Sequence, residues 1–238
     1  MSKVPWVYCS HISDSNEMEL PKEELRHLSG SLRRREGSTI VLFDGVGSVA
    51  YARLAEIKKK PLSGWVEIVS RDYVEKPHRK ICIATALPKR DRQAVMLDFL
   101  IQLGITDFVP LSCMYSVAHP SKNSLDRWQR ILIETCKQCN QPWLPTIHPG
   151  STPENLLESR QSIKNQVILL ADENGEFGHS IKNEIQQSDQ LLVVGPEGGF
   201  TIEEREKFIK NGALPIRLSA NNLRIEVAAI AIAALVLS

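Results

Sequence analysis

Residues 191–226 read LLVVGPEGGFTIEEREKFIKNGALPIRLSANNLRIE, and this stretch predicts both the fold class and the position of a site. The apolar run Leu191–Val194 is typical of a buried parallel strand. The loop Gly195–Gly199 follows it, and a helix then begins, with Thr201 as the expected N-cap and Glu204 as its capping-box partner. A strand, a glycine loop and a helix in this order indicate a ligand site at the carboxyl end of a parallel sheet.

The second half of the stretch continues the same alternation. Gly212 is placed to end the helix, because glycine adopts the left-handed conformation found after helix C-termini. A second apolar strand is expected at Ala213–Leu218, followed by a polar loop at Ser219–Asn222. The apolar run Val227–Leu237 predicts a last, buried helix.

The composition of the glycine loop restricts the ligand. A helix N-terminus favours anions, but Glu197 would repel a phosphate and the loop has no lysine to offset it. Neither GxGxxG nor GxxxxGK[ST] occurs. The loop therefore suits a neutral or cationic ligand that offers ribose hydroxyls, an amine or a sulfonium, such as S-adenosylmethionine. The same letters are equally compatible with a plain structural turn.

GPEGGFTIEE followed by LSANNLRIEVAA resembles the C-terminal motifs of the bacterial RsmE family, SPOUT-class methyltransferases that act on uridine N3 in small-subunit (16S) ribosomal RNA. The first motif matches almost residue for residue, and the second keeps Leu218, Leu223, Arg224 and Glu226. The resemblance implies an α/β fold with a mainly parallel sheet and a SPOUT-type trefoil knot. It also implies S-adenosylmethionine as cofactor, a homodimer, and the small ribosomal subunit or its RNA as partner.

The resemblance also implies roles for individual residues. The expected catalytic residues are Arg224, which would stabilise charge on the target base or hold its phosphate, and Glu226, which would orient Arg224 or meet an amine of the cofactor. A simpler alternative is an ion pair between these two residues at the helix N-terminus. The expected cofactor-binding positions are Leu170, Gly195, Glu197, Gly198, Leu218 and Leu223.

Residues 1–72 predict a small β-barrel, because several short strands follow one another with turn signals between them. The expected strands are Val4–Cys9, Ser38–Phe43, Val49–Ile57 and Gly64–Ser70, with a hairpin turn at Asp44–Gly45. In the family that this chain resembles, the corresponding part is a PUA-like RNA-binding domain, and Arg33 is expected to contact RNA. The Lys58–Lys60 triplet is interpreted as solvated.

Residues 77–238 predict a second domain in which strands alternate with helices, which is typical of a mainly parallel α/β sheet. Strands are expected at Ile81–Ala86, Ile105–Pro110 and Val167–Ala171, and helices at Asp91–Leu103 and Asn123–Asn140. Lys89 and Arg90, at the end of the first of these strands, are expected to contact RNA. Asp172 and Glu173 follow the third strand, and we interpret them as a solvated loop that could also reach the crevice of Glu197.

Composition restricts the class of protein. The net charge is +1, but residues 76–140 carry ten basic and five acidic side chains, a balance that suits a polyanion and is also typical of an ordinary solvated surface.

The longest apolar run is too short for a membrane span and no signal peptide is apparent, so a cytoplasmic location is expected. An odd number of cysteines favours a reducing compartment. Cys136-x-x-Cys139 is interpreted as a pair of structural thiols, and no metal site is expected.

Among the positions that depart from the family pattern, three have lost a basic residue. Phe99, Tyr115 and Gln141 stand where the family has basic residues expected near RNA. Two further hypotheses therefore remain beside the RsmE-like activity: a SPOUT methyltransferase that acts on a different RNA, and a non-catalytic relative that binds RNA or cofactor.

Overall fold

The computed structural model describes residues 4–160, 166–177 and 188–237 of the 238-residue chain. The chain divides into two compact units, one of residues 1–76 and 133–144 and one of residues 77–132 and 145–238. The sequence places residues 133–144 in the second domain, whereas their contacts belong to the first unit. Lys137 is ion-paired to Glu24 there, and the Trp143 indole N–H donates to the carbonyl of Val74 at 2.8 Å. Contacts between residues so far apart in the sequence cannot be predicted from the periodicity of apolar residues.

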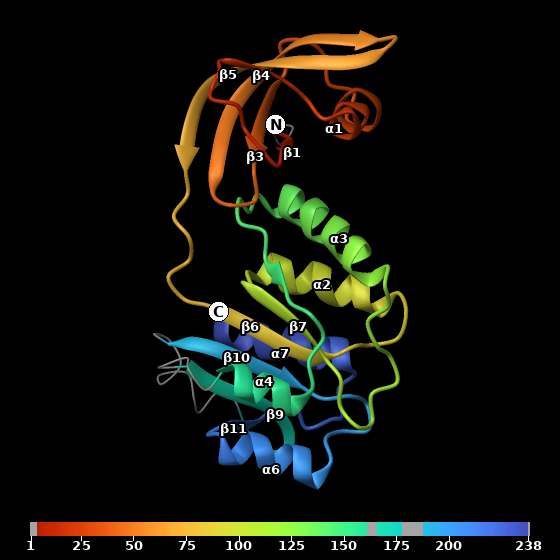
Figure 1. The fold of residues 1–238 in the computed structure, drawn as a ribbon, viewed down its shortest axis with the longest axis vertical. Coiled ribbons are helices and arrows are strands. Elements are labelled where there is room, and N and C mark those ends of the chain that lie inside the picture. The colour runs from red at the N-terminus through yellow and green to blue at the C-terminus, as the bar shows by residue number, and fades with distance from the viewer. Residues whose placement is uncertain (1–3, 161–165, 178–187, 238) are drawn as a thin grey trace. The chain divides into compact units, whose positions relative to one another are not determined.

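The first unit contains a five-stranded sheet in the order β1-β3-β4-β5-β2, in which only the β1–β3 pair is parallel. Its strands are β1 (Trp6–Tyr8), β2 (Glu17–Glu19), β3 (Thr39–Phe43), β4 (Ser48–Lys59) and β5 (Leu62–Tyr73). Figure 1 shows β4 and β5 as a long hairpin. Helix α1 (Lys22–Arg26) continues into the π-helix η1 (His27–Ser31). The fully buried Leu25, Leu42 and Val66 belong to the core of this unit.

The predicted turn at Asp44–Gly45 is confirmed, because β3 and β4 are antiparallel neighbours. One carboxylate oxygen of Asp44 accepts hydrogen bonds from the N–H groups of Val46 (2.8 Å) and Ser48 (3.0 Å). An aspartate that binds backbone donors ahead of it favours a tight turn. Strand β2 was not predicted, since its three residues offer a single apolar side chain, Met18, between two glutamates.

The second unit is built on a six-stranded sheet in the order β11-β9-β10-β6-β7-β8, and every neighbouring pair is parallel. The strands are β6 (Ile81–Ala86), β7 (Asp107–Leu111), β8 (Thr146–Ile147), β9 (Gln166–Phe177), β10 (Asp189–Val194) and β11 (Leu214–Arg217). The predicted mainly parallel α/β sheet is thus confirmed. Its central strand β10 lies between β9 and β6, and every residue of β6 is buried, as the apolar runs require.

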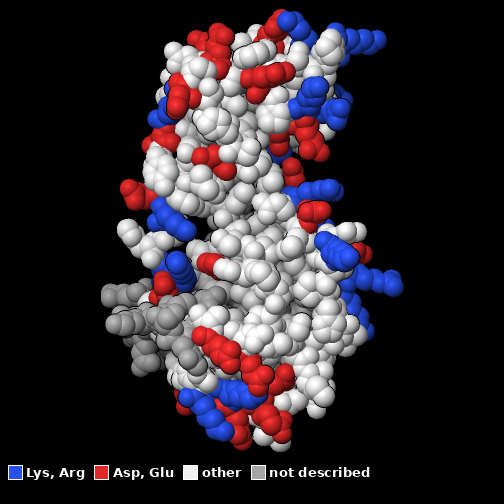
Figure 2. All heavy atoms as spheres, viewed as in Figure 1, with Lys and Arg blue, Asp and Glu red and all other residues white. Residues whose placement is uncertain are grey.

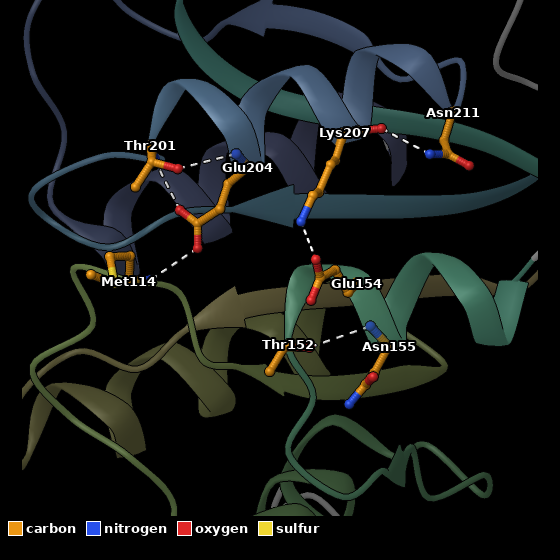
Figure 3. A network of polar contacts seen from close by, with 8 residues as sticks. All are labelled: Met114, Thr152, Glu154, Asn155, Thr201, Glu204, Lys207 and Asn211. Carbon is orange, nitrogen blue, oxygen red and sulfur yellow. Dashed lines mark hydrogen bonds and ion pairs between the residues drawn. The ribbon is translucent and has the colours of Figure 1, made fainter.

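Helices pack around this sheet (Figure 1). They are α2 (Arg92–Leu103), α3 (Ser124–Cys139), α4 (Pro153–Arg160), α6 (Ile202–Lys210) and α7 (Ile225–Leu237). Helix α7 packs against α2, and an ion pair between Lys207 and Glu154 joins α6 to α4 (Figure 3). In the described parts of the chain, no helix has both the length and the apolar character that crossing a bilayer requires.

The capping box predicted for α6 is confirmed. The N–H of Glu204 donates to Thr201 Oγ1 at 3.1 Å, and the N–H of Thr201 donates to Glu204 Oε2 at 2.9 Å. The helix ends at Lys210, and Gly212 follows with φ 83°. Helix α6 therefore starts at the expected cap, directly after the glycine loop.

Strand β9 differs from its prediction, and the difference shapes the site. The sequence predicts that the strand ends at Ala171, whereas β9 continues to Phe177. Its pairing with β11 jumps from Leu170 opposite Pro215 to Glu176 opposite Ile216, so that the residues between are displaced from the ladder. A side chain on Gly175 would place its Cβ 2.5 Å from the carbonyl carbon of Pro215. Glycine allows this close backbone approach and hence the bulge.

Candidate functional site

A cavity of about 450 Å³ lies where the loops after β10 and β11 meet the bulge of β9. Its volume is within the range of about 300–1,000 Å³ typical of small-molecule sites. Three segments form most of its wall: Ala171–Asn174, Val194–Phe200 and Ile216–Leu223. The carboxyl ends of neighbouring parallel strands are the expected position for a ligand in an α/β sheet.

Five of the six predicted cofactor-binding residues line this cavity: Gly195, Glu197, Gly198, Leu218 and Leu223. The sixth, Leu170, is fully buried in the core, and the cavity wall begins at its neighbour Ala171. The strand direction predicted from the sequence brings the five lining residues together, although they come from two separate segments.

The glycines of the loop have an unexpected function in the structure. The sequence suggests that they let a ligand approach the backbone. A Cβ on Gly195 would instead lie 2.8 Å from the ring of Phe200, and one on Gly198 would lie 3.1 Å from the Cβ of Tyr115. Both glycines therefore accommodate aromatic side chains of the protein itself, while their loop still lines the cavity.

The bulge of β9 brings Asp172 and Glu173 to the cavity wall that also holds Glu197, as the sequence allowed. They lie in a strand rather than a loop, and only Glu173 is exposed to solvent as expected. The side chain of Asp172 is 8% exposed and forms an ion pair with Arg205 of α6. The cavity wall holds three carboxylates, from Asp172, Glu173 and Glu197, and two guanidinium groups, from Arg205 and Arg217. Arg205 pairs with Asp172, so the carboxylates of Glu173 and Glu197 and the guanidinium of Arg217 are the other charged groups on the wall.

Arg217 holds the loop after β11. Its Nε donates to the carbonyl of Ser219 at 3.1 Å and its Nη2 to that of Ala220 at 3.4 Å, while the guanidinium lies over the ring of Phe177 at 5.3 Å. The N–H of Asn221 in turn donates to Ser219 Oγ. These contacts give the polar loop a defined shape along the cavity.

Glu226 has a partner that the sequence did not predict. Its Oε1 lies 3.4 Å from Arg92 Nη1, and Arg92 Nη2 lies 3.7 Å from Glu197 Oε1. The Glu226 side chain is 9% exposed, and its Oε2 is buried without a hydrogen-bond partner among the described residues. No ion pair between Arg224 and Glu226 occurs in the described part of the chain, and Arg224 is exposed. The alternative of a local helix-terminal pair was therefore wrong.

The sequence did not assign Arg92 to the cofactor site. It is the first residue of α2, after the loop at the carboxyl end of β6, and β6 pairs with β10. Because β6 and β10 are neighbours, α2 begins beside the glycine loop. The place of Arg92 directly after the loop that follows β6 is the sequence signal that could have identified it as a site residue.

The predicted RNA-binding residues are exposed but belong to different units: Arg33 to the first, Lys89 and Arg90 to the second. Arg33 and Arg90 both have left-handed backbone, with φ 50° and 48°. Non-glycine residues adopt this conformation at some cost, and it is enriched at functional sites. Figure 2 shows lysine and arginine side chains along the edge of the second unit where α2 and α3 begin.

Four of the five cysteines are buried thiols, and Cys139 is half-buried. Burial raises the pKa of Cys136 to about 12, with a smaller contribution from Cys139. A thiol with so high a pKa is a poor nucleophile and a poor metal ligand. In residues 4–160, 166–177 and 188–237 no group of three His, Cys, Asp or Glu side chains is arranged to hold a metal ion.

The parallel sheet, with a cavity at the carboxyl ends of its strands, defines a ligand-binding α/β unit. Residues 74–237 match the RNA methyltransferase domain family, and the chain belongs to this family. The resemblance found in the C-terminal motifs is thereby confirmed. A relative from Synechocystis named ribosomal RNA small subunit methyltransferase E is 28% identical over 207 residues, which are 86% of this chain and 67% of the relative.

Two solved structures are similar over almost the whole chain. A ribosomal RNA small subunit methyltransferase E from Neisseria gonorrhoeae, bound to S-adenosyl methionine, is 27% identical with a TM-score of 0.84 and covers 98% of this chain and 96% of that one. A structure from Legionella pneumophila, described as a methyltransferase in complex with the cofactor SAM, is 25% identical with a TM-score of 0.86, and the coverage is 98% and 97%.

Proposed function

We propose that this protein is an S-adenosylmethionine-dependent methyltransferase that modifies N3 of a uridine in small-subunit (16S) ribosomal RNA. Membership of the RNA methyltransferase family supports the reaction class. The names of the similar proteins support ribosomal RNA as the substrate. The observation that carries the proposal is the cavity in which the glycine loop, with its carboxylate Glu197, faces the loop after β11.

The donors and acceptors of the cavity fit the cofactor. S-adenosylmethionine combines a sulfonium, an amine and ribose hydroxyls, and carboxylates bind all three kinds of group. Glu197 and Glu173 supply them, and backbone at Gly195, Gly198, Leu218 and Leu223 would hold the adenosine. Leu170 would contribute indirectly. It is the last residue of β9 that pairs with β11 before the bulge, so it would fix the position of Ala171. When bound, the cofactor supplies a methyl group already activated on sulfur.

Methylation at uridine N3 requires the loss of the N3 proton, and negative charge then develops on the neighbouring carbonyl oxygens. Arg224 lies between Leu223 and Ile225, which both line the cavity, and its side chain is exposed. It would stabilise this charge or hold the phosphate of the target nucleotide. Glu226 would accept a hydrogen bond from the cofactor amine through Oε2, while Arg92 fixes its other oxygen.

RNA would be held by phosphate contacts from Arg33, Lys89 and Arg90, which position the substrate without reading its sequence. Residues 1–72 would form the PUA-like RNA-binding domain and residues 77–238 the SPOUT domain with its trefoil knot. We further propose a homodimer that acts in the cytoplasm on the small ribosomal subunit.

Replacement of Glu197 by glutamine tests the cofactor site. The loss of a charge-assisted contact should weaken S-adenosylmethionine binding about tenfold in isothermal titration calorimetry. Glu203→Gln is the matched control, because this glutamate is exposed on α6. Equal affinities of the Glu197→Gln variant and the unaltered protein would contradict the role of the loop.

Mass analysis of 16S ribosomal RNA tests the substrate. RNA from a strain that lacks the gene should miss one methyl group on a uridine, and the gene should restore it. A methyl group lost from another RNA instead would favour the second hypothesis, which the basic residues missing at Phe99, Tyr115 and Gln141 leave open. A purified protein that binds the cofactor but transfers no methyl group to either RNA would favour a non-catalytic relative.

A further inference from the structure

The loop that follows β7 exposes apolar side chains beside the candidate site. Three of its residues are largely exposed: Met114 (76%), Tyr115 (52%) and Val117 (65%). Water-exposed apolar groups clustered in this way usually mark a binding surface. Tyr115 is also one of the positions at which the family motif has an arginine that is expected near RNA.

The loop is held in one shape by hydrogen bonds. The N–H of Cys113 donates to Ser116 Oγ at 2.9 Å, and the N–H of Ser116 donates to the carbonyl of Cys113 at 3.0 Å. Cys113 itself is buried. The exposed side chains therefore project from a fixed turn.

Glu204 joins this turn to the N-cap of α6, which follows the glycine loop. Figure 3 shows its carboxylate between two backbone donors: Oε2 accepts from the N–H of Thr201 in the capping box, and Oε1 accepts from the N–H of Met114, each at 2.9 Å. One carboxylate thus sets the start of α6 and the position of the turn that carries Tyr115.

Tyr115 lies directly against the glycine loop. A Cβ on Gly198 would be 3.1 Å from the Cβ of Tyr115 and 3.4 Å from its Cγ. Gly198 lines the cavity. The Cβ and Cγ atoms of the half-exposed Tyr115 therefore lie at the wall of the candidate cofactor site.

We propose that Tyr115 is the surface on which the target nucleobase stacks, and that Glu204 is the residue that positions it. The proposal rests on the function proposed above. A base that reacts at a ring nitrogen must leave its own stack, and proteins hold such unstacked bases against aromatic side chains. An arginine at this position would contact RNA through its charge, whereas the tyrosine of this chain offers an aromatic face. The ligand is thus a pyrimidine base of single-stranded or flipped-out RNA.

The first test separates stacking from packing. Tyr115→Leu keeps apolar contact with Gly198 but removes the ring, and Tyr115→Phe keeps the ring. We expect the leucine variant to raise the KM for small ribosomal subunits from a gene-deletion strain by roughly five- to a hundredfold, the range that stacking of one base contributes. The phenylalanine variant should stay within about twofold of the unaltered protein, because stacking needs only the ring. The affinity for S-adenosylmethionine should be unchanged in both.

Phe99→Leu is the matched control. Phe99 is exposed to a similar degree (48%) and also replaces a family basic residue, but it lies on helix α2. Its KM should not change. A leucine variant of Tyr115 with unchanged KM, or a phenylalanine variant as impaired as the leucine variant, would overturn the stacking role.

A second test does not depend on turnover. Small-subunit RNA with 5-iodouridine in place of uridine should form a photo-crosslink to Tyr115, since this base reacts with aromatic rings on which it stacks. Mass spectrometry would locate the crosslinked peptide. A crosslink elsewhere, with none at Tyr115, would overturn the inference and leave the methyltransferase assignment intact. A protein that binds neither RNA nor cofactor would overturn both.

A comparison of two variants separates the contact of Glu204 with Met114 from its role in the helix cap. Thr201→Ala removes one half of the capping box, and Glu204→Ala removes the other half together with the Met114 contact. Both variants should lose stability. Only Glu204→Ala should also raise the KM for RNA, by about fivefold or more if the stacking of one base is lost. An equal KM in the two variants would show that Glu204 does no more than cap α6.

Discussion

Arg92 contacts two carboxylates that come from different elements, Glu197 of the glycine loop and Glu226 of α7. A buried carboxylate is stable only when it is paired, because desolvation disfavours its charge. Glu226 is the more buried of the two, so it depends more on the guanidinium. The geometry of a proposed catalytic group is therefore set by a residue from the opposite end of the domain sequence.

We expect Arg92→Met to lower the free energy of unfolding by about 2 kcal/mol, less than for a fully buried pair because Arg92 is one-third exposed. The affinity for S-adenosylmethionine should also fall. Urea unfolding and calorimetry measure the two effects. Lys89→Met, at an exposed neighbouring position, should leave the stability within about 0.5 kcal/mol. A double variant with Glu226→Gln should recover part of the loss, and no recovery would argue against this pairing.

At the scale of elements, the bulge of β9 decides which residues form the cavity wall. It displaces Ala171–Asn174 from the ladder between β9 and β11, and all four line the cavity. Gly175 ends the bulge at a backbone approach that admits no side chain. A strand prediction based on apolar residues ends at Ala171, because the bulge is polar and its pairing partner lies far along the chain.

Gly175→Ala should destabilise the protein by about 2 kcal/mol, since the new Cβ would meet backbone atoms of β11 and the two strands must separate. Thermal unfolding measures the change. Gly30→Ala is the matched control, because a Cβ there would meet no atom within 4 Å, and its stability should be unchanged or higher. Equal melting temperatures for both alanine variants would contradict the close approach at Gly175.

At the scale of the whole molecule, helix α3 begins in the second unit and ends in the first. Lys137, near its C-terminal end, is 8% exposed and bonded to both Glu24 and Glu134 at 2.9 Å. Burial alone would lower the pKa of Lys137, but the hydrogen bonds with Glu134 and Glu24 outweigh it and raise the pKa above 10.5. The pairing thus stabilises the first unit as long as the lysine stays protonated.

Lys137→Met should cost about 3 kcal/mol of stability at neutral pH, because it leaves the buried Glu24 carboxylate unpaired. The sign of the pH dependence follows from the raised pKa. The stabilisation is complete below pH 10.5 and is lost as the pH rises through the higher pKa of the folded state. Urea unfolding across this range should show an alkaline loss that the variant lacks. Lys210→Met, at a 73% exposed lysine, should behave like the unaltered protein.

Local chemistry was enough to predict much of this molecule from its sequence. The apolar runs specified five strands of the parallel sheet but not the two-residue strand β8, and Thr201 with Glu204 specified the start of α6. The strands and the helix cap depend on contacts between residues close in sequence, or on a strand direction that all parallel sheets share. The resemblance of the C-terminal motifs to the RsmE family, rather than local chemistry, implied the five residues that line one cavity.

Only the tertiary structure decided the partners of charged groups. It paired Glu226 with Arg92 rather than Arg224, brought Asp172 to Arg205, and grouped Lys137 with Glu24. It also placed Tyr115 against Gly198, where the sequence suggested space for a ligand. Each of these contacts joins segments far apart in the chain. Periodicity and local motifs do not indicate which distant side chain fills a space or neutralises a buried charge.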